Sequence, residues 1–343
     1  MTVTKAHIDV LPGADPRAPL LEVNDLHVEF RTQYGVAKAV NGANFRLAAG
    51  ETLAILGESG CGKSVTAQAI MGILDSPPGF ITKGQIKYRG VDLLGVAEEQ
   101  RRKVRANQIA MIFQDALSAL NPVYTVGFQL AELFRIHRGM SRKDAKKRAI
   151  ELLDQVKIPA AKTRVDDYPH QFSGGMRQRV MIAMALALDP EVLIADEPTT
   201  ALDVTVQAQI MGLLADLQKQ RNMGLILITH DMGVVADVAD RISVMYAGKV
   251  VEEAGVYDIY SRPAHPYTRA LLESIPRLDM KGQQLNVIQG LPPALTSIPQ
   301  GCAFNPRCRF AKDPCRQDPA PPAYAVAPQR TARCHFFREV LGE

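Results

Sequence analysis

The sequence predicts an α/β fold with a mixed sheet core, an inserted helical subdomain and a cysteine-containing C-terminal extension. Short apolar runs rich in β-forming residues alternate with helical stretches, as in parallel strands joined by helical crossovers; they lie at 191–195, 225–229 and 241–246. A glycine-rich loop at 57–64 stands between a predicted strand and a predicted helix. Beyond about residue 261 prolines become dense, and four of the five cysteines follow.

The length and composition allow one large domain with an appendage. The 343 residues, 47% of them hydrophobic, can fill a substantial core. Forty basic and 36 acidic residues give a formal charge of +4, too even a balance to indicate nucleic acid or an anionic membrane as the main ligand. We predict a flexible tail at 1–19, a main domain at 20–260 with a helical subdomain at about 115–180, and an extension at 261–343.

The main domain is expected to begin with strands. The run LLEVNDLHVEF at 20–30 alternates apolar and polar residues, and short apolar runs follow at 44–47 and 52–56. These runs predict an antiparallel edge that leads into the central sheet. Between 116 and 168 apolar residues recur at intervals of three and four with little strand signal, which predicts the helical subdomain.

No targeting or membrane-spanning segment is expected. The first 20 residues lack the basic start and apolar core of a signal peptide, and the longest apolar run, at 180–188, is far shorter than the roughly 20 residues of a membrane helix. The sequence therefore predicts a cytosolic protein that reaches a membrane only through a protein partner.

A phosphate-binding loop is the most specific motif. It matches G-x-x-x-x-G-K-[ST] with Gly57, Glu58, Ser59, Gly60, Cys61, Gly62, Lys63 and Ser64. Glycines let backbone N–H groups approach a phosphate closely. We predict that Lys63 binds the β and γ phosphates and that Ser64 binds Mg²⁺, at the positive end of a helix that begins at Gly62 and includes Val65. Cys61 is interpreted as a small filler rather than a redox switch, because no resolving thiol is evident nearby.

An acidic pair, Asp196 and Glu197, ends the apolar strand EVLIA. An aspartate that leaves a buried strand beside a phosphate loop can hold Mg²⁺ through water, and an adjacent carboxylate can polarise the attacking water. Alone, such a pair would more often be a helix cap or solvated. Together with the phosphate loop, it predicts the metal-binding and catalytic carboxylates.

As a set, these motifs resemble the ATP-binding subunits of ABC transporters. Further matches are Gln114 (Q-loop), Ser173, Gly174 and Gly175 (signature, preceded by Phe172 and followed by Met176), Ala201, Leu202 and Asp203 (D-loop), and His230 (switch histidine). The resemblance implies that Ser173 and its two glycines bind the γ phosphate held by a second ATPase subunit, identical or paralogous. It also implies that Gln114 senses Mg²⁺ and the γ phosphate, which His230 contacts. Phe30, or else Tyr34, would stack on adenine, although either could be an ordinary core or loop residue.

The segment His265-Pro266-Tyr267-Thr268 resembles the tail of the dipeptide and oligopeptide import branch, to which nickel and glutathione importers are related. This resemblance implies an ATPase bound to two membrane permease subunits at the cytoplasmic face of the inner membrane, and indirectly to an extracytoplasmic binding protein. A non-transport ABC protein acting on ribosomes or DNA is the alternative from another class, but it usually has paired ATPase domains, a coiled-coil insertion or a basic arm. A nucleotide sensor without turnover is disfavoured because Glu197 and His230 are both present. No nucleic acid partner is expected, and the transported solute is left open.

Four cysteines in the extension, Cys302, Cys308, Cys315 and Cys334, follow the spacing C-x₅-C-x₆-C-x₁₈-C. A cytosolic location disfavours stable disulfides, and structural zinc sites favour closer cysteine pairs. We interpret the four as ligands of a [4Fe–4S] cluster, which the tails of this branch also resemble. Zinc and free or transiently oxidised thiols remain the alternatives.

Overall fold

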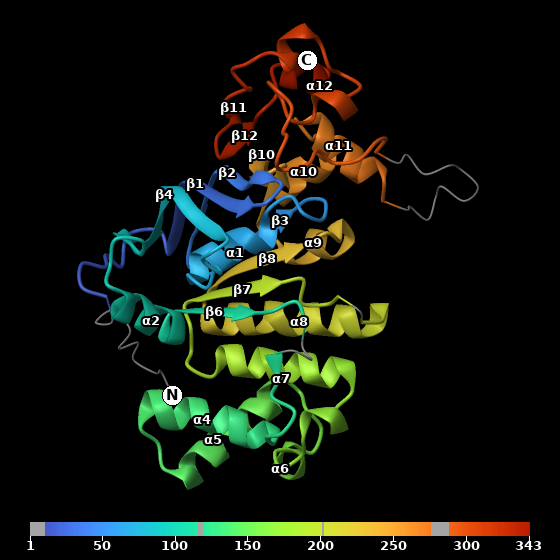
Figure 1. Ribbon diagram of the computed structural model, residues 1–343. Helices are drawn as coiled ribbons and strands as arrows, with labels where there is room; N and C mark the ends of the chain where they lie inside the picture. Colours follow the sequence, from blue (N-terminus) through green and yellow to red (C-terminus); the bar gives the residue numbers. More distant parts are fainter. Residues whose placement is uncertain (1–10, 116–118, 201, 276–287) are drawn as a thin grey trace. The chain divides into compact units, whose positions relative to one another are not determined.

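The computed structural model describes residues 11–115, 119–200, 202–275 and 288–343. The chain forms two compact units, each made of segments that are separate along the sequence. Figure 1 colours the chain from its N-terminus to its C-terminus. Unit 1 takes in the described residues up to Leu21, together with Leu47–Glu51 and Tyr88–Leu227; unit 2 takes in Glu22–Arg46, Thr52–Lys87 and Ile228–Glu343. No helix within the described ranges is both long enough and apolar enough to cross a membrane.

Unit 1 is built on a parallel strand pair covered by helices. β6 (Ile109–Ile112) pairs in parallel with β7 (Val192–Asp196), whose five residues are all buried. α2 (Glu98–Asn107) and α7 (Gly174–Leu186) pack against β6, and α7 also packs against α8 (Val204–Arg221). The buried strand β7 thereby delivers its last residue to the carboxyl edge of the pair, where parallel sheets place their ligands.

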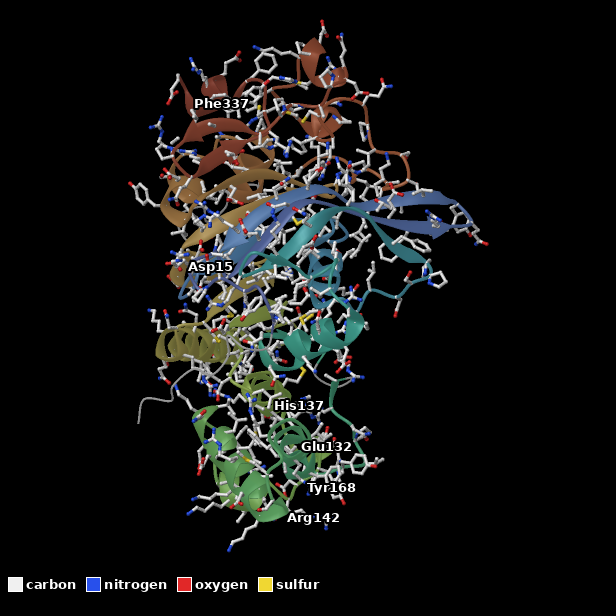
Figure 2. The ribbon with its side chains drawn as sticks, turned by 90° about the vertical axis from the view of Figure 1, so that its left-hand side faces the viewer. Asp15, Glu132, His137, Arg142, Tyr168 and Phe337 are labelled. Atoms are coloured by element: carbon white, nitrogen blue, oxygen red, sulfur yellow. The ribbon has the colours of Figure 1, made fainter. Side chains whose placement is uncertain are left out.

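Helices occupy the segment between β6 and β7. They are α4 (Val126–Arg138), α5 (Arg142–Gln155), α6 (Ala161–Arg164), the 3₁₀ turn η2 (Pro169–Gln171) and α7. Thr125 and Ser141 cap α4 and α5 by accepting from backbone N–H groups of their first turns. The predicted helical character is confirmed, and Figure 2 marks this region by the labels Glu132, His137 and Arg142. Residues 116–118, at its start, lie outside the described ranges.

Unit 2 contains a five-strand portion of a mixed sheet. β3 (Thr52–Leu56) pairs in parallel with β9 (Arg241–Tyr246), and β9 pairs antiparallel with β10 (Lys249–Gly255). β10 then pairs antiparallel with β12 (Arg330–Ala332), which pairs antiparallel with β11 (Tyr324–Ala327). The mixed sheet is confirmed. The last two strands belong to the cysteine-containing extension, for which the sequence predicted no strands.

A second sheet in unit 2 has the order β2, β1, β4. β1 (Leu21–Thr32) and β2 (Gly35–Leu47) are joined by two residues, Gln33 and Tyr34, a connection that only antiparallel neighbours can have. β4 (Gly79–Tyr88) lies on the other side of β1. The antiparallel edge expected from the alternation at 20–30 is therefore present.

The remaining elements are short. In unit 2 they are the helices α1 (Lys63–Met71), α9 (Met232–Val238), α10 (Val256–Ser261), α11 (Pro266–Glu273) and α12 (Phe337–Leu341), with 3₁₀ turns η4 (Asn305–Arg307) and η5 (Asp313–Arg316). β5 (Val91–Asp92) lies in unit 1, and the fully buried strand β8 (Gly224–Thr229) follows α8. The helix predicted from Gly62 through Met71 is confirmed as α1, with Gly62 as its N-cap.

Candidate functional site

The glycine-rich loop in unit 2 joins β3 to α1, as predicted. Gly62 caps α1 with φ 106°, in the region open chiefly to glycine, and a Cβ there would lie 2.2 Å from the Ala39 carbonyl oxygen. A Cβ on Gly57 would lie 2.3 Å from the Met245 carbonyl oxygen. These two glycines let the loop pass against neighbouring backbone, so the spacing of the motif follows from packing as well as from ligand approach.

Lys63 is buried, with 5% of its side chain surface exposed. Its Nζ donates to the carbonyl oxygens of Gly57, at 2.8 Å, and Glu58, at 3.1 Å. The ammonium group is therefore folded back over the loop that carries it. This position lets the same charge serve a phosphate held by the loop.

Glu58 is bound by two residues of the C-terminal extension, Tyr267 of the His-Pro-Tyr-Thr segment and Arg307. Its backbone N–H donates to the Tyr267 hydroxyl oxygen at 2.9 Å. Its carboxylate accepts from both terminal nitrogens of Arg307, at 2.7 and 2.9 Å. The two partners lie 209 and 249 residues from Glu58 along the chain, so no local sequence pattern predicts these contacts. No sequence signal marks Arg307.

Cys61 is 5% exposed, and burial raises the pKa of its thiol, with the nearby Lys63 charge opposing the shift. A buried, protonated thiol is a poor nucleophile, so this environment favours the packing role over a redox switch. The two adenine-stacking candidates differ in exposure. Phe30 is half-buried beside Gly79, whereas Tyr34 is 83% exposed at the β1–β2 turn.

The acidic pair stands at the end of β7 in unit 1. Asp196 is the last residue of the strand and is 4% exposed. Glu197 follows with φ 46°, a left-handed conformation that is uncommon for glutamate. Its Oε2 accepts from Gln114 Nε2 at 2.8 Å and from the Thr200 hydroxyl at 3.0 Å. The fold thus brings together Gln114 and Glu197, two of the predicted site residues, 83 positions apart.

The signature serine begins a helix in unit 1. Ser173 is the N-cap of α7, and its hydroxyl accepts from the Met176 N–H at 3.4 Å. Ser173 and Gly174 are both exposed, so the N-terminus of α7 is open to solvent. A Cβ on Gly175 would lie 2.6 Å from Val206 in α8, which places the signature against the start of α8. This geometry suits an anion supplied from outside the unit.

Asp203 caps α8 by accepting from the Val206 N–H at 3.0 Å. Ala201, the first residue of the predicted D-loop, lies outside the described ranges. In unit 2, His230 follows β8 and is exposed. The next residue, Asp231, donates its N–H to Thr229 Oγ1 and caps α9, which anchors the backbone on the C-terminal side of His230. Asp203 and His230 thus each stand just before a helix.

All four extension cysteines line one small cavity, together with Phe304, Phe310 and Phe336. The five cysteines of the chain are free thiols. Burial raises the pKa of Cys302 to about 11 and that of Cys334 to about 12. Within the described residues, no group of three or more His, Cys, Asp or Glu side chains is placed to hold a metal ion. That finding supports neither the predicted cluster nor the zinc alternative.

The His-Pro-Tyr-Thr segment holds the extension together. His265 is fully buried and caps α11 by accepting the Tyr267 N–H on Nδ1, at 3.1 Å. Burial lowers its pKa to about 3. The backbone N–H groups of Ala264 and His265 donate to the buried carboxylate of Glu252, at 2.7 and 2.9 Å. These bonds place Tyr267 where its hydroxyl meets the phosphate loop.

We expect His265 to make the protein less stable in mild acid. Its unfolded pKa is about 6.5, so between that pH and about 3 the unfolded state binds the extra proton and stability falls as pH falls. From pH 7.5 to 5.5 the wild type should lose about 1.4 kcal/mol of unfolding free energy. His265→Asn should not lose it, because asparagine does not bind a proton in this range, and asparagine can still cap the helix. Urea unfolding at the two pH values measures this difference.

The control is His137→Asn, on the exposed residue of α4 labelled in Figure 2. This variant should lose the same stability as the wild type between the two pH values. Equal losses in wild type and His265→Asn would contradict the assignment of the proton to His265.

Known proteins resemble this chain along most of its length. The ABC transporter family matches residues 40–200, and the oligopeptide/dipeptide transporter C-terminal region matches residues 251–315. The oligopeptide transport ATP-binding protein OppD of Bacillus subtilis is 54% identical over 293 residues, 85% of this chain and 82% of that protein. A putative peptide import ATP-binding protein of Brucella melitensis is 48% identical over 335 residues, 94% of this chain and 99% of that protein.

Among solved structures, the ADP- and phosphate-bound dimer of the ATP-binding cassette MJ0796 superposes with a TM-score of 0.62 at 28% identity. It covers 69% of this chain and 98% of that one. The matches to these two relatives cover more than four fifths of both proteins in each case. The chain therefore belongs to the ABC transporter family, as an ATPase with the oligopeptide/dipeptide transporter C-terminal region.

Proposed function

We propose that this chain is the ATP-hydrolysing subunit that powers a membrane importer of dipeptides or oligopeptides. The observation that carries the proposal is the C-terminal region at 251–315, which belongs to a family defined by oligopeptide and dipeptide transporters. The relatives named for peptide transport also match 85% and 94% of this chain, which is more than its ATPase motifs. The domain limits of 20–260 for the ATPase and 261–343 for the extension remain part of this proposal.

In the proposed reaction, residues 57–65 bind the triphosphate of ATP, with Lys63 on the β and γ phosphates. Ser64, with Asp196 through water and Gln114, would hold Mg²⁺, which supplies Lewis-acid stabilisation of the phosphates when bound. Glu197 would orient and polarise the attacking water, and the bonds from Gln114 and Thr200 support that role by fixing its carboxylate. His230 would contact the γ phosphate.

We infer that two ATPase subunits, this chain with a copy or a paralogue, complete each site. Ser173, Gly174 and Gly175 of one subunit would cover the γ phosphate bound by the other. The exposed N-terminus of α7 supports this arrangement because a helix N-terminus attracts anions. Asp203 would lie at the same dimer interface, and Phe30 or Tyr34 would stack on the adenine. Closing and opening of the dimer would then move two permease subunits. An extracytoplasmic binding protein would deliver the solute to these permease subunits.

The experiment is purification of the tagged chain from detergent-solubilised membranes, combined with uptake assays in a strain that lacks its gene. Two integral membrane proteins should copurify, and uptake of a labelled tripeptide should fall. Association with the inner membrane through these proteins is expected to vanish when they are deleted. A loss of nickel or glutathione uptake with intact peptide uptake would overturn the substrate assignment, and cosedimentation with ribosomes would overturn the transport assignment.

We propose further that Cys302, Cys308, Cys315 and Cys334 hold a [4Fe–4S] cluster. Support comes from the donor set, since four cysteine side chains line one cavity. A cluster is larger than a single ion, so its thiolate ligands stand further apart than those of zinc. Iron binding would replace the protons that burial otherwise keeps on these thiols, and the cluster would stabilise the extension.

Anaerobically purified protein should therefore absorb at about 400 nm and contain about four iron atoms per chain. Cys302→Ser and Cys334→Ser should lose the colour and the iron. Cys61→Ser, which changes the one cysteine outside the extension, should keep both. A colourless wild type, with or without one zinc ion per chain, would rule the cluster out.

A further inference from the structure

The C-terminal extension makes a bidentate ion pair with the phosphate loop inside unit 2. Arg307 Nη1 and Nη2 lie 2.7 and 2.9 Å from the two carboxylate oxygens of Glu58. The side chain of Arg307 is 5% exposed and that of Glu58 is 25% exposed. Parallel, short N–H···O bonds with little solvent make this pair one of the strong kind.

Tyr267 binds the same residue from a second element of the extension. Its hydroxyl oxygen accepts the Glu58 N–H at 2.9 Å. Lys63 Nζ meets the Glu58 carbonyl oxygen at 3.1 Å. The N–H, the carbonyl group and the carboxylate of Glu58 all make hydrogen bonds, and together these bonds fix the conformation of Glu58 in the loop.

Arg307 is itself held in place. Its Nε donates to the Gln289 carbonyl oxygen at 3.1 Å, and its Nη1 lies 3.3 Å from the Tyr246 hydroxyl. It ends the turn η4, between Cys302 and Cys308, and Asn305 of that turn donates to the Cys302 carbonyl oxygen at 2.8 Å. The position of the guanidinium group therefore depends on the fold of the cysteine-bearing segment.

The electrostatic consequence concerns the ligand of the loop. Glu58 places a carboxylate in a loop that must accept a polyanionic triphosphate, and unpaired like charges at such short range repel. The Arg307 guanidinium neutralises that carboxylate, and the bonds to Tyr267 and Lys63 order the loop before the ligand arrives. Preordering a binding loop raises affinity because less conformational entropy is lost on binding.

We propose that Arg307 and Tyr267 are positioning residues of the nucleotide site, which hold Glu58 in the phosphate loop and cancel its charge. The C-terminal extension is then a working part of ATP binding rather than only a separate appendage. This inference rests on the proposed binding of the triphosphate by residues 57–65.

The test measures the dissociation constant for fluorescent ATP with Mg²⁺, using the full chain in 50 and 300 mM salt. Arg307→Met should weaken binding roughly 10-fold at low salt and less at high salt, because salt screens the repulsion between the unpaired Glu58 carboxylate and the phosphates. Tyr267→Phe, which removes only one oxygen atom, should weaken binding roughly threefold. The same variants should speed backbone hydrogen exchange at residues 57–64.

A double-mutant cycle separates this role from general destabilisation. In the Glu58→Gln background, Arg307→Met should change the dissociation constant by less than about twofold, because no charge is left to neutralise. Arg309→Met is the matched control, since Arg309 is 57% exposed and pairs with Glu273 instead. It should bind ATP as the wild type does.

Two results would overturn the inference. One is wild-type affinity in Arg307→Met, and the other is an equal loss with and without the carboxylate of Glu58. A wild-type protein that binds no ATP would instead refute the proposed nucleotide site itself. Thermal unfolding of every variant, monitored by circular dichroism, confirms that the folded chain is being compared.

Discussion

Replacing Glu197 with glutamine is expected to lower the ATP hydrolysis rate roughly 10²- to 10⁴-fold, the usual contribution of a general base. Glutamine matches the size of glutamate and its amide oxygen can still accept from Gln114 and Thr200, so the geometry at the end of β7 should persist. Only the negative charge that polarises water is removed. The dissociation constant for ATP should stay within about threefold, so kcat falls while binding is retained.

Phosphate release by the assembled transporter measures the rate, and fluorescent ATP measures binding. Glu151→Gln is the control, because Glu151 is 41% exposed in an ion pair with Arg148 on α5. That variant should hydrolyse ATP at the wild-type rate. Wild-type turnover in Glu197→Gln would show that Glu197 is not the catalytic base.

Replacing Lys63 with methionine is expected to weaken ATP binding roughly 10²- to 10⁴-fold. A lysine that contacts two phosphates makes at least two charge-assisted bonds, each contributing about 1.5–3 kcal/mol. The unbranched methionine side chain can fill most of the buried space of lysine, so the fold should survive. The bonds from Nζ to the carbonyl oxygens of Gly57 and Glu58 would also be lost, which loosens the loop further.

Isothermal titration with ATP and Mg²⁺ measures the loss. Lys83→Met makes the same substitution in the same unit at a site that is 68% exposed and paired with Asp25. Its affinity should equal that of the wild type. Tight binding by Lys63→Met would place the triphosphate away from the loop and contradict the assignment of the whole motif.

Local patterns predicted the elements that carry the motifs. The run at 52–56 forms β3, the run at 241–246 forms β9, and the helix after the phosphate loop ends at Met71 as expected. Each depends on residues near one another in sequence: apolar side chains at strand or helix period, and glycines where the backbone needs a positive φ.

Contacts between distant segments were not predicted. β12 adds the extension to the sheet through β10, although the proline-rich segment around it has no strand pattern. Arg307 and Glu58 meet across 249 residues, and Gln114 meets Glu197 across 83. The local sequence around a charged loop residue is the same whether its side chain is solvated or paired with a distant residue.

The sequence by itself determined the ATPase motifs, the α/β class and the resemblance to the peptide-import branch, because spacing along the chain encodes a strand, a glycine-rich turn and a helix. Only the tertiary structure decided that Tyr267 and Arg307 bind Glu58, and that four cysteines scattered over 33 positions line one cavity. The physical reason is that burial and charge pairing depend on which surfaces the completed fold brings together, a property that no local window of residues contains.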